Sequence, residues 1–425
     1  MESGMVEFLD WEYHAEGNAN IIVKNQQQNL ALRIRKYAKV QETSHSNKLG
    51  NLLSLEQEQL FLKLISSTYF KNENHYLSLY TPVYLSKEFL VKLMVNIDLK
   101  RPDYRKTKTI SLESQTCILM PFIGQFKPDR SFSSDLFVSV EIKPKWGFIP
   151  TSKFIKNTIK KKVCRFCLHQ NYKVQKSNKT LSKYCPLDLF GGCKTGVEHA
   201  IRSLLQTPQN NLKLAVSGTV CCIDELDSQS AINYESLPKV LSEIFYKDSE
   251  PGTSNQEAKI QICEQSNFKR PLYDDCMNFG VKGILNLLRK MQCLDTLDVE
   301  YIFPHYKDIL EKSGYTENDF LDYHSDLWTK FFGSEQDSFK RTTQPEIWDI
   351  CQYLVSATFK DCSILITFCE LVSTKDDDLH SKSIVIVDGK SYQYDIKLID
   401  LDPRLLQNIP YYYQQDSDIA SAWNG

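Results

Sequence analysis

Residues 131–152, SFSSDLFVSVEIKPKWGFIPTS, contain the clearest strand signal in the chain and decide how its second half folds. Apolar and polar residues alternate from Val138 to Ile142, which is typical of a β-strand. The proline after Lys143 ends this strand, because its nitrogen cannot donate to a neighbouring strand. Glu141 and Lys143 share one face, and Lys145 follows just beyond. Two lysines and a glutamate at a strand end suit phosphate binding, but the same pattern also fits a solvent-facing edge strand.

Positive charge is concentrated around this strand end. The chain carries 51 basic and 53 acidic side chains, a formal net charge of −2. Residues 141–183, which we call the basic segment, hold twelve basic residues and one acid, leaving 39 basic and 52 acidic residues elsewhere. Clustered like charge repels itself unless a partner neutralises it, and the apolar residues Trp146, Phe148 and Phe154 indicate a folded segment. The basic segment therefore predicts a polyanion site, with nucleic acids and phosphorylated small molecules both open.

Composition excludes several classes of protein. The 425 residues include only 16 glycines and 15 prolines, which excludes collagen-like and Pro/Gly-rich disordered chains. No apolar run approaches the roughly 18 residues of a membrane span. The N-terminal segment MESGMVEFLDWEYH carries acids where a signal peptide would be basic. We therefore expect a protein of the cytosol, the nucleus or both.

The thirteen cysteines are an odd number and indicate thiols rather than a disulfide framework. Cys164 and Cys167 have the spacing of one metal-binding pair. Cys185 and Cys193 are eight positions apart, so no second pair completes a zinc site by spacing.

Local patterns predict an α+β fold with two lobes. Short strands and turns over residues 11–34 predict a small antiparallel sheet in an N-terminal lobe, residues 1–120. Residues 121–425 are predicted to form a larger mixed α/β lobe with a mostly helical insertion at about 223–345.

Three helix starts are predicted. Ser86 is predicted to cap a helix that runs to about Asn96, and Thr195 with Glu198 has the pattern of a capping box that opens a helix through Leu205. A further helix is predicted from Pro345 onward, since proline suits a first helical turn.

Acidic residues stand at predicted strand ends near the C-terminus. Asp400 and Asp402 close an apolar strand, where carboxylates suit Mg²⁺ carrying nucleotide phosphates. Asp361 precedes the strand at 363–368, a position for a rigid general base but also for a turn or cap residue. The Asp388-Gly389 pair predicts a hairpin between a strand at residues 384–387 and the strand at 392–401 that Asp400 closes. A plain three-strand meander would place Asp361 and Asp400 at opposite ends.

The turn at residues 16–20, EGNAN, lies between two predicted strands. Its small residues would let backbone N–H groups approach phosphates, although its single glycine also suits an ordinary turn. The chain contains no Walker A loop, GxGxxG, His-Arg-Asp or Asp-Phe-Gly, which excludes ordinary P-loop and protein-kinase sequences.

Three strings of residues together resemble a known family. They are Glu141-Ile-Lys-Pro-Lys-Trp-Gly147, Tyr184-Cys-Pro-Leu-Asp-Leu-Phe190, and Asp361-Cys-Ser363 followed by Asp400-Leu-Asp402. In this order and spacing, the chain resembles the inositol-pentakisphosphate 2-kinase family over nearly its whole length. The resemblance implies a two-lobed, distantly protein-kinase-like fold. It also implies transfer of the ATP γ-phosphate to the 2-hydroxyl of inositol 1,3,4,5,6-pentakisphosphate, giving inositol hexakisphosphate (phytate).

The resemblance further implies roles for individual residues. Asp361 would take the proton of the 2-hydroxyl, and Lys143 would stabilise charge on the transferred phosphoryl group. Asp400, helped by Asp402, would hold Mg²⁺ with ATP. The residues implied to bind the nucleotide are Gly17, Asn18, Ala19, Asn20, Arg33, Glu141, Asn211, Lys213 and Asp400. Those implied to bind the inositol phosphates are Arg105, Lys143, Lys145, Lys173, Asn210, Asp361, Arg404, Tyr412 and Tyr413.

Some positions depart from the family pattern. Lys213 stands where relatives tend to have arginine, which removes a bidentate donor for the nucleotide. The segment 402–406 lacks the usual Leu-Lys-Pro, although Arg404 keeps a cation there. Plant relatives carry a zinc site that includes cysteines, and residues 312–318 contain none, so we predict that zinc is absent.

An alternative is a catalytically silent protein that binds inositol phosphates or RNA through the same cations. The acids Asp361 and Asp400 beside Lys143 argue against it, since a pure binder gains nothing from carboxylates next to phosphates. We expect ATP and inositol pentakisphosphate as partners, no membrane or nucleic acid, and a monomer.

Overall fold

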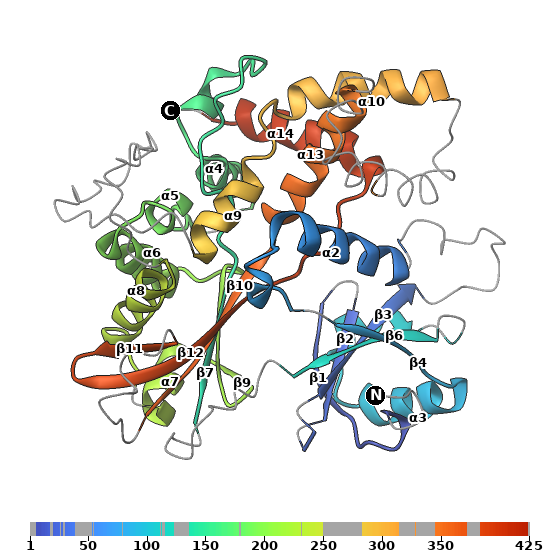
Figure 1. The fold of residues 1–425 in the computed structure, drawn as a ribbon, viewed down its shortest axis with the longest axis vertical. Helices are drawn as coiled ribbons and strands as arrows, with labels where there is room; N and C mark the ends of the chain where they lie inside the picture. Colours follow the sequence, from blue (N-terminus) through green and yellow to red (C-terminus); the bar gives the residue numbers. More distant parts are fainter. Residues whose placement is uncertain are drawn as a thin grey trace. The chain divides into compact units, whose positions relative to one another are not determined.

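The computed structural model of the chain divides into two units, each with its own sheet (Figure 1). Unit 1 holds the described residues up to Phe122, and unit 2 holds those from Leu136 onward. The fold is mixed α+β with antiparallel sheets, as the sequence predicted. The structure describes residues 6–17, 20–25, 27–28, 30–38, 53, 55–78, 80–110, 112, 115–122, 136–177, 180–230, 232–249, 283–313, 328, 345–371 and 383–423.

Unit 1 is built on a six-stranded antiparallel sheet in the order β1-β2-β3-β6-β4, with β5 paired to β3. The predicted N-terminal strands correspond to β1 to β3. The strands are β1 Glu12–Glu16, β2 Asn20–Asn25, β3 Leu30–Ala38, β4 Thr81–Tyr84, β5 Lys108–Ile110 and β6 Thr116–Pro121. The helices are α2 Leu55–Tyr69 and α3 Lys87–Asp98, with the short 3₁₀ turns η2 Asn74–Tyr76 and η3 Asp103–Arg105.

Helix α3 shows how local sequence sets an element of unit 1. Ser86 is its N-cap, and the serine side chain accepts a hydrogen bond from the Phe89 backbone N–H at 3.2 Å, as the sequence predicted. Leu90, Leu93 and Ile97 recur every three or four residues and are buried in the core of the sheet.

Unit 2 contains a second six-stranded antiparallel sheet, in the order β11-β12-β10-β7-β8-β9. β7 lies between β10 and β8, so it is not an edge strand. The edge-strand alternative for Glu141 and Lys143 is therefore excluded. The strands are β7 Val138–Ile142, β8 Leu212–Val216, β9 Thr219–Cys221, β10 Ser363–Glu370, β11 Ile384–Val387 and β12 Lys390–Ile399.

The strand order of this sheet differs from a meander. The Asp388-Gly389 turn has positive φ at both residues, 50° and 78°, and joins β11 to β12 as a tight hairpin. β12, not β11, pairs with β10 (Figure 1), and Ser363 faces Ile399 across the two strands. The start of β10 and the end of β12 therefore meet, which resolves the difficulty that a meander would create.

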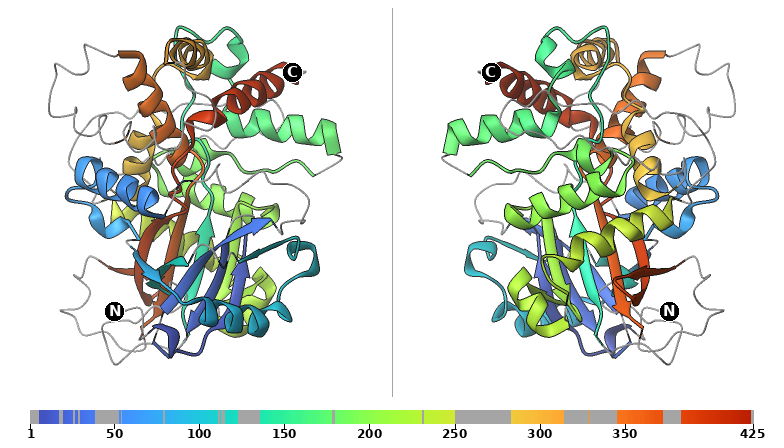
Figure 2. Two further views of the ribbon diagram at one scale, coloured as in Figure 1. Left: turned by 90° about the vertical axis from the view of Figure 1, so that its right-hand side faces the viewer. Right: turned by 90° about the vertical axis from the view of Figure 1, so that its left-hand side faces the viewer.

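Helices flank the sheet of unit 2. α8 lies beside α6 and β11, and α14 lies beside α4 (Figures 1 and 2). α13 has the predicted proline at its start. The helices are α4 Arg165–Ser177, α5 Pro186–Leu189, α6 Lys194–Gln206, α7 Ile223–Ser230, α8 Ser236–Asp248, α9 Ile284–Gln292, α10 Val299–Ser313, α13 Pro345–Phe359 and α14 Ile409–Ser421, with the 3₁₀ turns η4 Thr158–Lys161 and η6 Leu406–Asn408.

The described parts of the predicted insertion, 223–230, 232–249, 283–313 and 328, are largely helical. The rest of the insertion lies outside the described residues. Among the described helices, none combines the length and the apolar character needed to cross a membrane.

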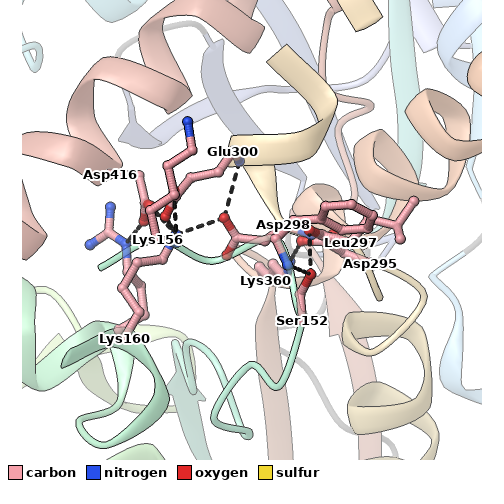
Figure 3. Close-up of polar contacts among 11 residues, drawn as sticks. Ser152, Lys156, Lys160, Asp295, Leu297, Asp298, Glu300, Lys360 and Asp416 are labelled. Atoms are coloured by element: carbon pink, nitrogen blue, oxygen red, sulfur yellow. Dashed lines mark hydrogen bonds and ion pairs between the residues drawn. The ribbon is translucent and has the colours of Figure 1, made fainter. Parts of the chain in front are cut away.

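A buried lysine joins three elements of unit 2 (Figure 3). The Lys160 Nζ lies 2.5 Å from Asp416 Oδ2, 2.6 Å from Asp298 Oδ1 and 3.1 Å from Glu300 Oε1. η4, the start of α10 and α14 supply these four residues. The three carboxylates are close enough together to suggest a cation site, and the lysine ammonium is the cation that they share.

Burial raises the pKa of Asp298 to about 6. The positive charge of Lys160 lowers this pKa, whereas the negative charges of Asp416 and Asp295 raise it. One lysine thus serves more than one buried carboxylate.

Candidate functional site

One end of the unit 2 sheet gathers most of the predicted site residues. Ile142 at the end of β7 pairs with Ile364 and with Leu212, so β8 and β10 begin where β7 and β12 end. We call the polar residues at this edge the strand-end site, which comprises Glu141, Lys143, Lys145, Asn211, Lys213, Asp361, Ser363, Asp400 and Arg404.

Lys143 lies between β7 and the end of β12. Its Nζ donates to Asp400 Oδ2 at 2.9 Å. Its backbone N–H donates to the Asn211 carbonyl at 2.9 Å, and the Asn211 side chain donates back to the Lys143 carbonyl at 2.9 Å. Burial opposes the charge on this lysine, but Asp400, Glu141 and Asp361 outweigh burial and raise its pKa. Lys143 therefore stays cationic at neutral pH in a fixed position.

Asp361 lies between two cations. Lys145 Nζ donates to its Oδ1 at 2.6 Å, and Arg404 Nη2 donates to its Oδ2 at 2.5 Å. Burial favours the neutral carboxyl, but Lys145, Arg404 and Lys143 outweigh it and lower the pKa of Asp361. Asp361 is therefore a carboxylate at neutral pH, and an incoming anion would compete with it for Lys145 and Arg404.

Ser363 links the two other acids of the site. Its hydroxyl donates to Glu141 Oε1 at 3.0 Å and lies 3.5 Å from Asp400 Oδ2. Lys213 Nζ contacts the other oxygen of Glu141 at 2.8 Å. Ser363 is fully buried, and it had no predicted role, although it belongs to one of the strings that carried the resemblance. Local sequence patterns could not have identified its contacts, because they depend on the sheet register, in which Ser363 lies opposite Ile399.

Two residues of the strand-end site have a backbone that ordinary residues rarely adopt. Lys145 has φ 61° and Asp400 has φ 60°. A left-handed conformation at a non-glycine residue costs free energy and persists only when surrounding contacts maintain it. Both residues follow the end of a strand, β7 for Lys145 and β12 for Asp400, and both side chains form ion pairs there.

Thr358 at the end of α13 attaches the segment that carries Arg404. Its hydroxyl donates to the Asp402 carbonyl at 3.4 Å and accepts from the Arg404 backbone N–H at 3.2 Å. Burial lowers the pKa of the Arg404 guanidinium, but Asp361, Tyr412 and Asp402 outweigh it and raise that pKa. Asp402 therefore lies near the site, and its backbone carbonyl accepts the hydrogen bond from Thr358.

The basic segment brings further cations together. His169 on α4 is half-buried, and burial lowers its pKa to about 3 with the help of Lys173, Arg165 and Lys145. The positive charges of Lys145 and Lys173 both lower the pKa of the His169 imidazole. Lys173, a predicted inositol-phosphate ligand, therefore lies close to the same imidazole as Lys145 of the strand-end site.

The two predicted tyrosines differ in their surroundings. Tyr412 is near Arg404, Asn408 and Asp361; burial raises the pKa of its phenol, with Arg404 opposing. Tyr413 instead stacks on Phe303 of α10, with ring centroids 4.3 Å apart. The structure thus brings Tyr412, and not Tyr413, toward Asp361. Asn210 lies in the turn before β8.

The predicted residues of unit 1 are described by themselves. The Gly17 N–H donates to the Asn20 carbonyl at 3.0 Å and closes the turn, in which Asn18 and Ala19 lie outside the described residues. A Cβ at Gly17 would meet no atom within 4 Å. Arg33 sits on β3 between Ile22 and Ile118 in the sheet register.

Glu16, at the start of the same turn, has a buried side chain whose ion pairs were not predicted from the sequence. Glu16 accepts from Lys36 Nζ at 2.6 Å and from Arg101 Nε at 3.1 Å. Arg101 also donates to the carbonyls of Arg105 and Lys108, at 3.1 and 2.8 Å. Arg101 therefore fixes both the start of the turn and the 3₁₀ turn that carries the predicted ligand Arg105.

Two sequence interpretations of unit 2 need revision. The helix at residues 194–206 begins after Cys193, whose sulfur accepts from the Gly196 N–H at 3.4 Å, so Thr195 is not its cap. Cys185 lies next to the Cys164–Cys167 pair, with 3.7 Å between the sulfurs of Cys164 and Cys185. The spacing of the cysteines along the chain did not predict this three-thiol cluster, because the fold brings Cys185 next to Cys164 and Cys167. The absence of zinc stays a prediction.

The oxygen donors of the strand-end site fit a hard divalent cation. Asp400, with a half-exposed side chain, and Glu141 present carboxylates joined by the Ser363 hydroxyl.

Comparison with known proteins adds an independent finding. The family model described as inositol-pentakisphosphate 2-kinase matches residues 13–418. The chain is 28% identical to the inositol-pentakisphosphate 2-kinase of Danio rerio, over 99% of this chain and 94% of that protein. It is 26% identical to that of Arabidopsis thaliana, over 98% of this chain and 93% of the relative. It is 25% identical to that of Cryptococcus neoformans, over 97% of this chain and 93% of the relative.

Proposed function

Since this chain belongs to the inositol-pentakisphosphate 2-kinase family, we propose that its strand-end site carries out the reaction of that family. The reaction transfers a phosphoryl group from ATP to the 2-hydroxyl of inositol pentakisphosphate and yields inositol hexakisphosphate. The observation that carries this assignment is Asp361, a carboxylate between Lys145 and Arg404 beside Lys143.

Asp361 is the proposed acceptor of the proton of the 2-hydroxyl. As that oxygen forms its bond to the γ-phosphorus, the bond from phosphorus to the β-phosphate oxygen breaks and ADP leaves. The proton passes to an Asp361 oxygen and then to solvent. The lowered pKa of Asp361 is compatible with this role, because phosphoryl transfer depends mainly on positioning and on charge stabilisation and does not need a strong base.

Lys143 is proposed to stabilise the phosphoryl group in transfer. Its raised pKa keeps the ammonium charged, and its two backbone contacts with Asn211 hold it in place. A preorganised cation needs no reorganisation when charge develops, which is why such groups lower barriers effectively.

Lys145 and Arg404 are proposed to bind substrate phosphates. With no substrate they neutralise Asp361. When a phosphate takes over their charge, Asp361 loses part of its stabilisation and its pKa rises toward the ordinary range, which improves it as a proton acceptor. Lys173, Asn210, Arg105, Tyr412 and Tyr413 are the further proposed ligands of the inositol phosphates.

Asp400 and Asp402, with Glu141 and Ser363 nearby, are proposed to hold Mg²⁺. When bound, this ion would neutralise charge on the nucleotide phosphates. We also propose that Asn211, Lys213, Arg33 and residues 17–20 bind the nucleotide, that the two units correspond to the lobes of a distantly kinase-like fold, and that the protein acts as a monomer in the cytosol or nucleus.

The test of the reaction is incubation of the purified protein with Mg-ATP and inositol 1,3,4,5,6-pentakisphosphate, followed by anion-exchange chromatography. A hexakisphosphate peak is expected. Binding of pentakisphosphate by calorimetry without this peak would instead support a silent binder.

The test of the proposed base is Asp361→Asn, which keeps the side-chain shape and removes the charge. Turnover should fall by about 10²-fold or more, in line with typical general-base effects, while pentakisphosphate binding by calorimetry stays within severalfold. Wild-type turnover in this variant would refute the assignment of Asp361.

A further inference from the structure

Gln292, the last residue of α9, is fully buried, and its side chain makes three hydrogen bonds. Its Nε2 donates to the carbonyls of Lys145 and Phe359, at 2.9 and 3.1 Å. Its Oε1 accepts from the Gly147 N–H at 2.8 Å. Because the partners are two acceptors and one donor, they fix the orientation of the amide and use both of its N–H groups.

These three contacts join the two segments that form the Lys145–Asp361 ion pair. Lys145 and Gly147 belong to the loop after β7, and Phe359 is the last residue of α13, two positions before Asp361. Lys145 has the left-handed φ of 61°, so its carbonyl direction depends on such outside support.

The surroundings hold Gln292 itself in place. The Ser356 hydroxyl, in α13, donates to the Gln292 backbone carbonyl at 2.5 Å. Next to Asp361, Lys360 Nζ contacts Asp295 Oδ2 at 2.6 Å (Figure 3) and lies 4.1 Å from the centre of the Trp146 ring. Side-chain contacts thus connect α9, the loop after β7 and the end of α13 to one another.

We infer that Gln292 is a positioning residue for phosphoryl transfer, which sets the distance between Lys145 and Asp361 from behind the site. The inference rests on the proposed roles of these two residues. The Gln292 side chain contacts neither the transferred phosphoryl group nor the 2-hydroxyl in the proposed reaction. A change at Gln292 should therefore act by displacing Lys145 and Asp361, and this displacement should lower kcat. Displacement of a catalytic group by about 1 Å can cost about 10²-fold in rate.

The test is Gln292→Met, which keeps the length of the side chain and removes the amide. The matched control is Gln393→Met, the same change at another buried position of unit 2, on β12 opposite Cys369. For Gln292→Met, kcat should fall about 10- to 100-fold, while the KM for ATP stays within about twofold. For Gln393→Met, kcat should stay within about twofold of wild type. Circular dichroism and thermal midpoints establish that both variants are folded.

Ser356→Ala provides a second variant that keeps the amide and removes only the support of its backbone. The kcat of Ser356→Ala should fall by about 3- to 10-fold, a smaller loss than that expected for Gln292→Met. This milder change keeps the inference testable should Gln292→Met fail to fold, and wild-type turnover in Ser356→Ala would then overturn it.

Asp361→Asn, assayed in parallel, separates the inference from the function on which it rests. Loss of turnover in Asp361→Asn with wild-type kcat in Gln292→Met would overturn the inference alone. Wild-type turnover in Asp361→Asn would overturn the proposed base and the positioning role together. Equal losses of kcat in Gln292→Met and Gln393→Met would contradict the positioning role of Gln292, since that result indicates general destabilisation.

Discussion

Replacing Lys160 with methionine should destabilise unit 2 strongly. The side chain is 3% exposed and its ammonium contacts Asp298, Glu300 and Asp416. Methionine fills a similar volume but has no charge, so the substitution removes the cation that the three acids share. Two of these acids, Asp298 and Asp416, have side chains that are less than 10% exposed. Removing one partner of a buried ion pair typically costs about 3–5 kcal/mol. The thermal midpoint should fall by roughly 10 °C, at a few degrees per kcal/mol for a unit of this size.

The loss should depend on pH. Burial already raises the pKa of Asp298 to about 6 in the folded protein, above the ordinary aspartate value. Without Lys160, the carboxyl pKa of Asp298 rises further, so the folded variant binds more protons than its unfolded chain between about pH 4 and that raised value. Its stability therefore falls as pH rises through this window, and the deficit against wild type should be larger at pH 8 than at pH 5.

The assay is urea unfolding of wild type and variant at both pH values, followed by intrinsic tryptophan fluorescence. Lys161→Met is the matched control, since its neighbouring side chain is exposed on the same 3₁₀ turn, and its effect should stay within about 0.5 kcal/mol. A deficit below about 1 kcal/mol for Lys160→Met, or an equal deficit at pH 5 and pH 8, would refute the reasoning.

Three further substitutions test the strand-end site and the loop after β7. Lys145→Ala should raise the KM for inositol pentakisphosphate about 10-fold or more, as loss of a charge-assisted contact predicts, and an unchanged KM in steady-state kinetics would count against its role. Gly147→Ala should lower stability by about 1–3 kcal/mol in urea unfolding, because its Cβ would lie 2.5 Å from the Phe190 ring; a neutral result would mean that Phe190 moves freely. Ser363→Ala should raise the Mg²⁺ concentration needed for half-maximal activity severalfold, since the buried hydroxyl joins Glu141 to Asp400, and an unchanged Mg²⁺ titration would contradict this.

Local sequence determined many of the elements. The Ser86 cap, the helix from Pro345 and the hairpin at Asp388-Gly389 all depend on residues within a few positions of one another, and the structure confirms them. The capping box at Thr195 was wrong, because Cys193 occupies the cap position with a sulfur acceptor. The concentration of charge in the basic segment was also visible without a fold.

The three strings that carried the resemblance were sufficient for the family, because they hold most residues of the strand-end site, all except Asn211, Lys213 and Arg404, at characteristic intervals. The match of the family model to residues 13–418 agrees with them. The individual roles of Asp361, Lys143 and the predicted ligands stay predictions, since no substrate contact tests them.

Only the tertiary structure decided which distant residues meet. Pairing of β12 with β10 brings Asp400 to the end at which Asp361 lies, and the central place of β7 gives Glu141 a covered position between β10 and β8. Ser363, Gln292 and the partners of Lys160 could not be identified from periodicity. Their contacts cross intervals of 37 to 256 residues, and such contacts depend on strand order and register, which many local patterns leave equally open.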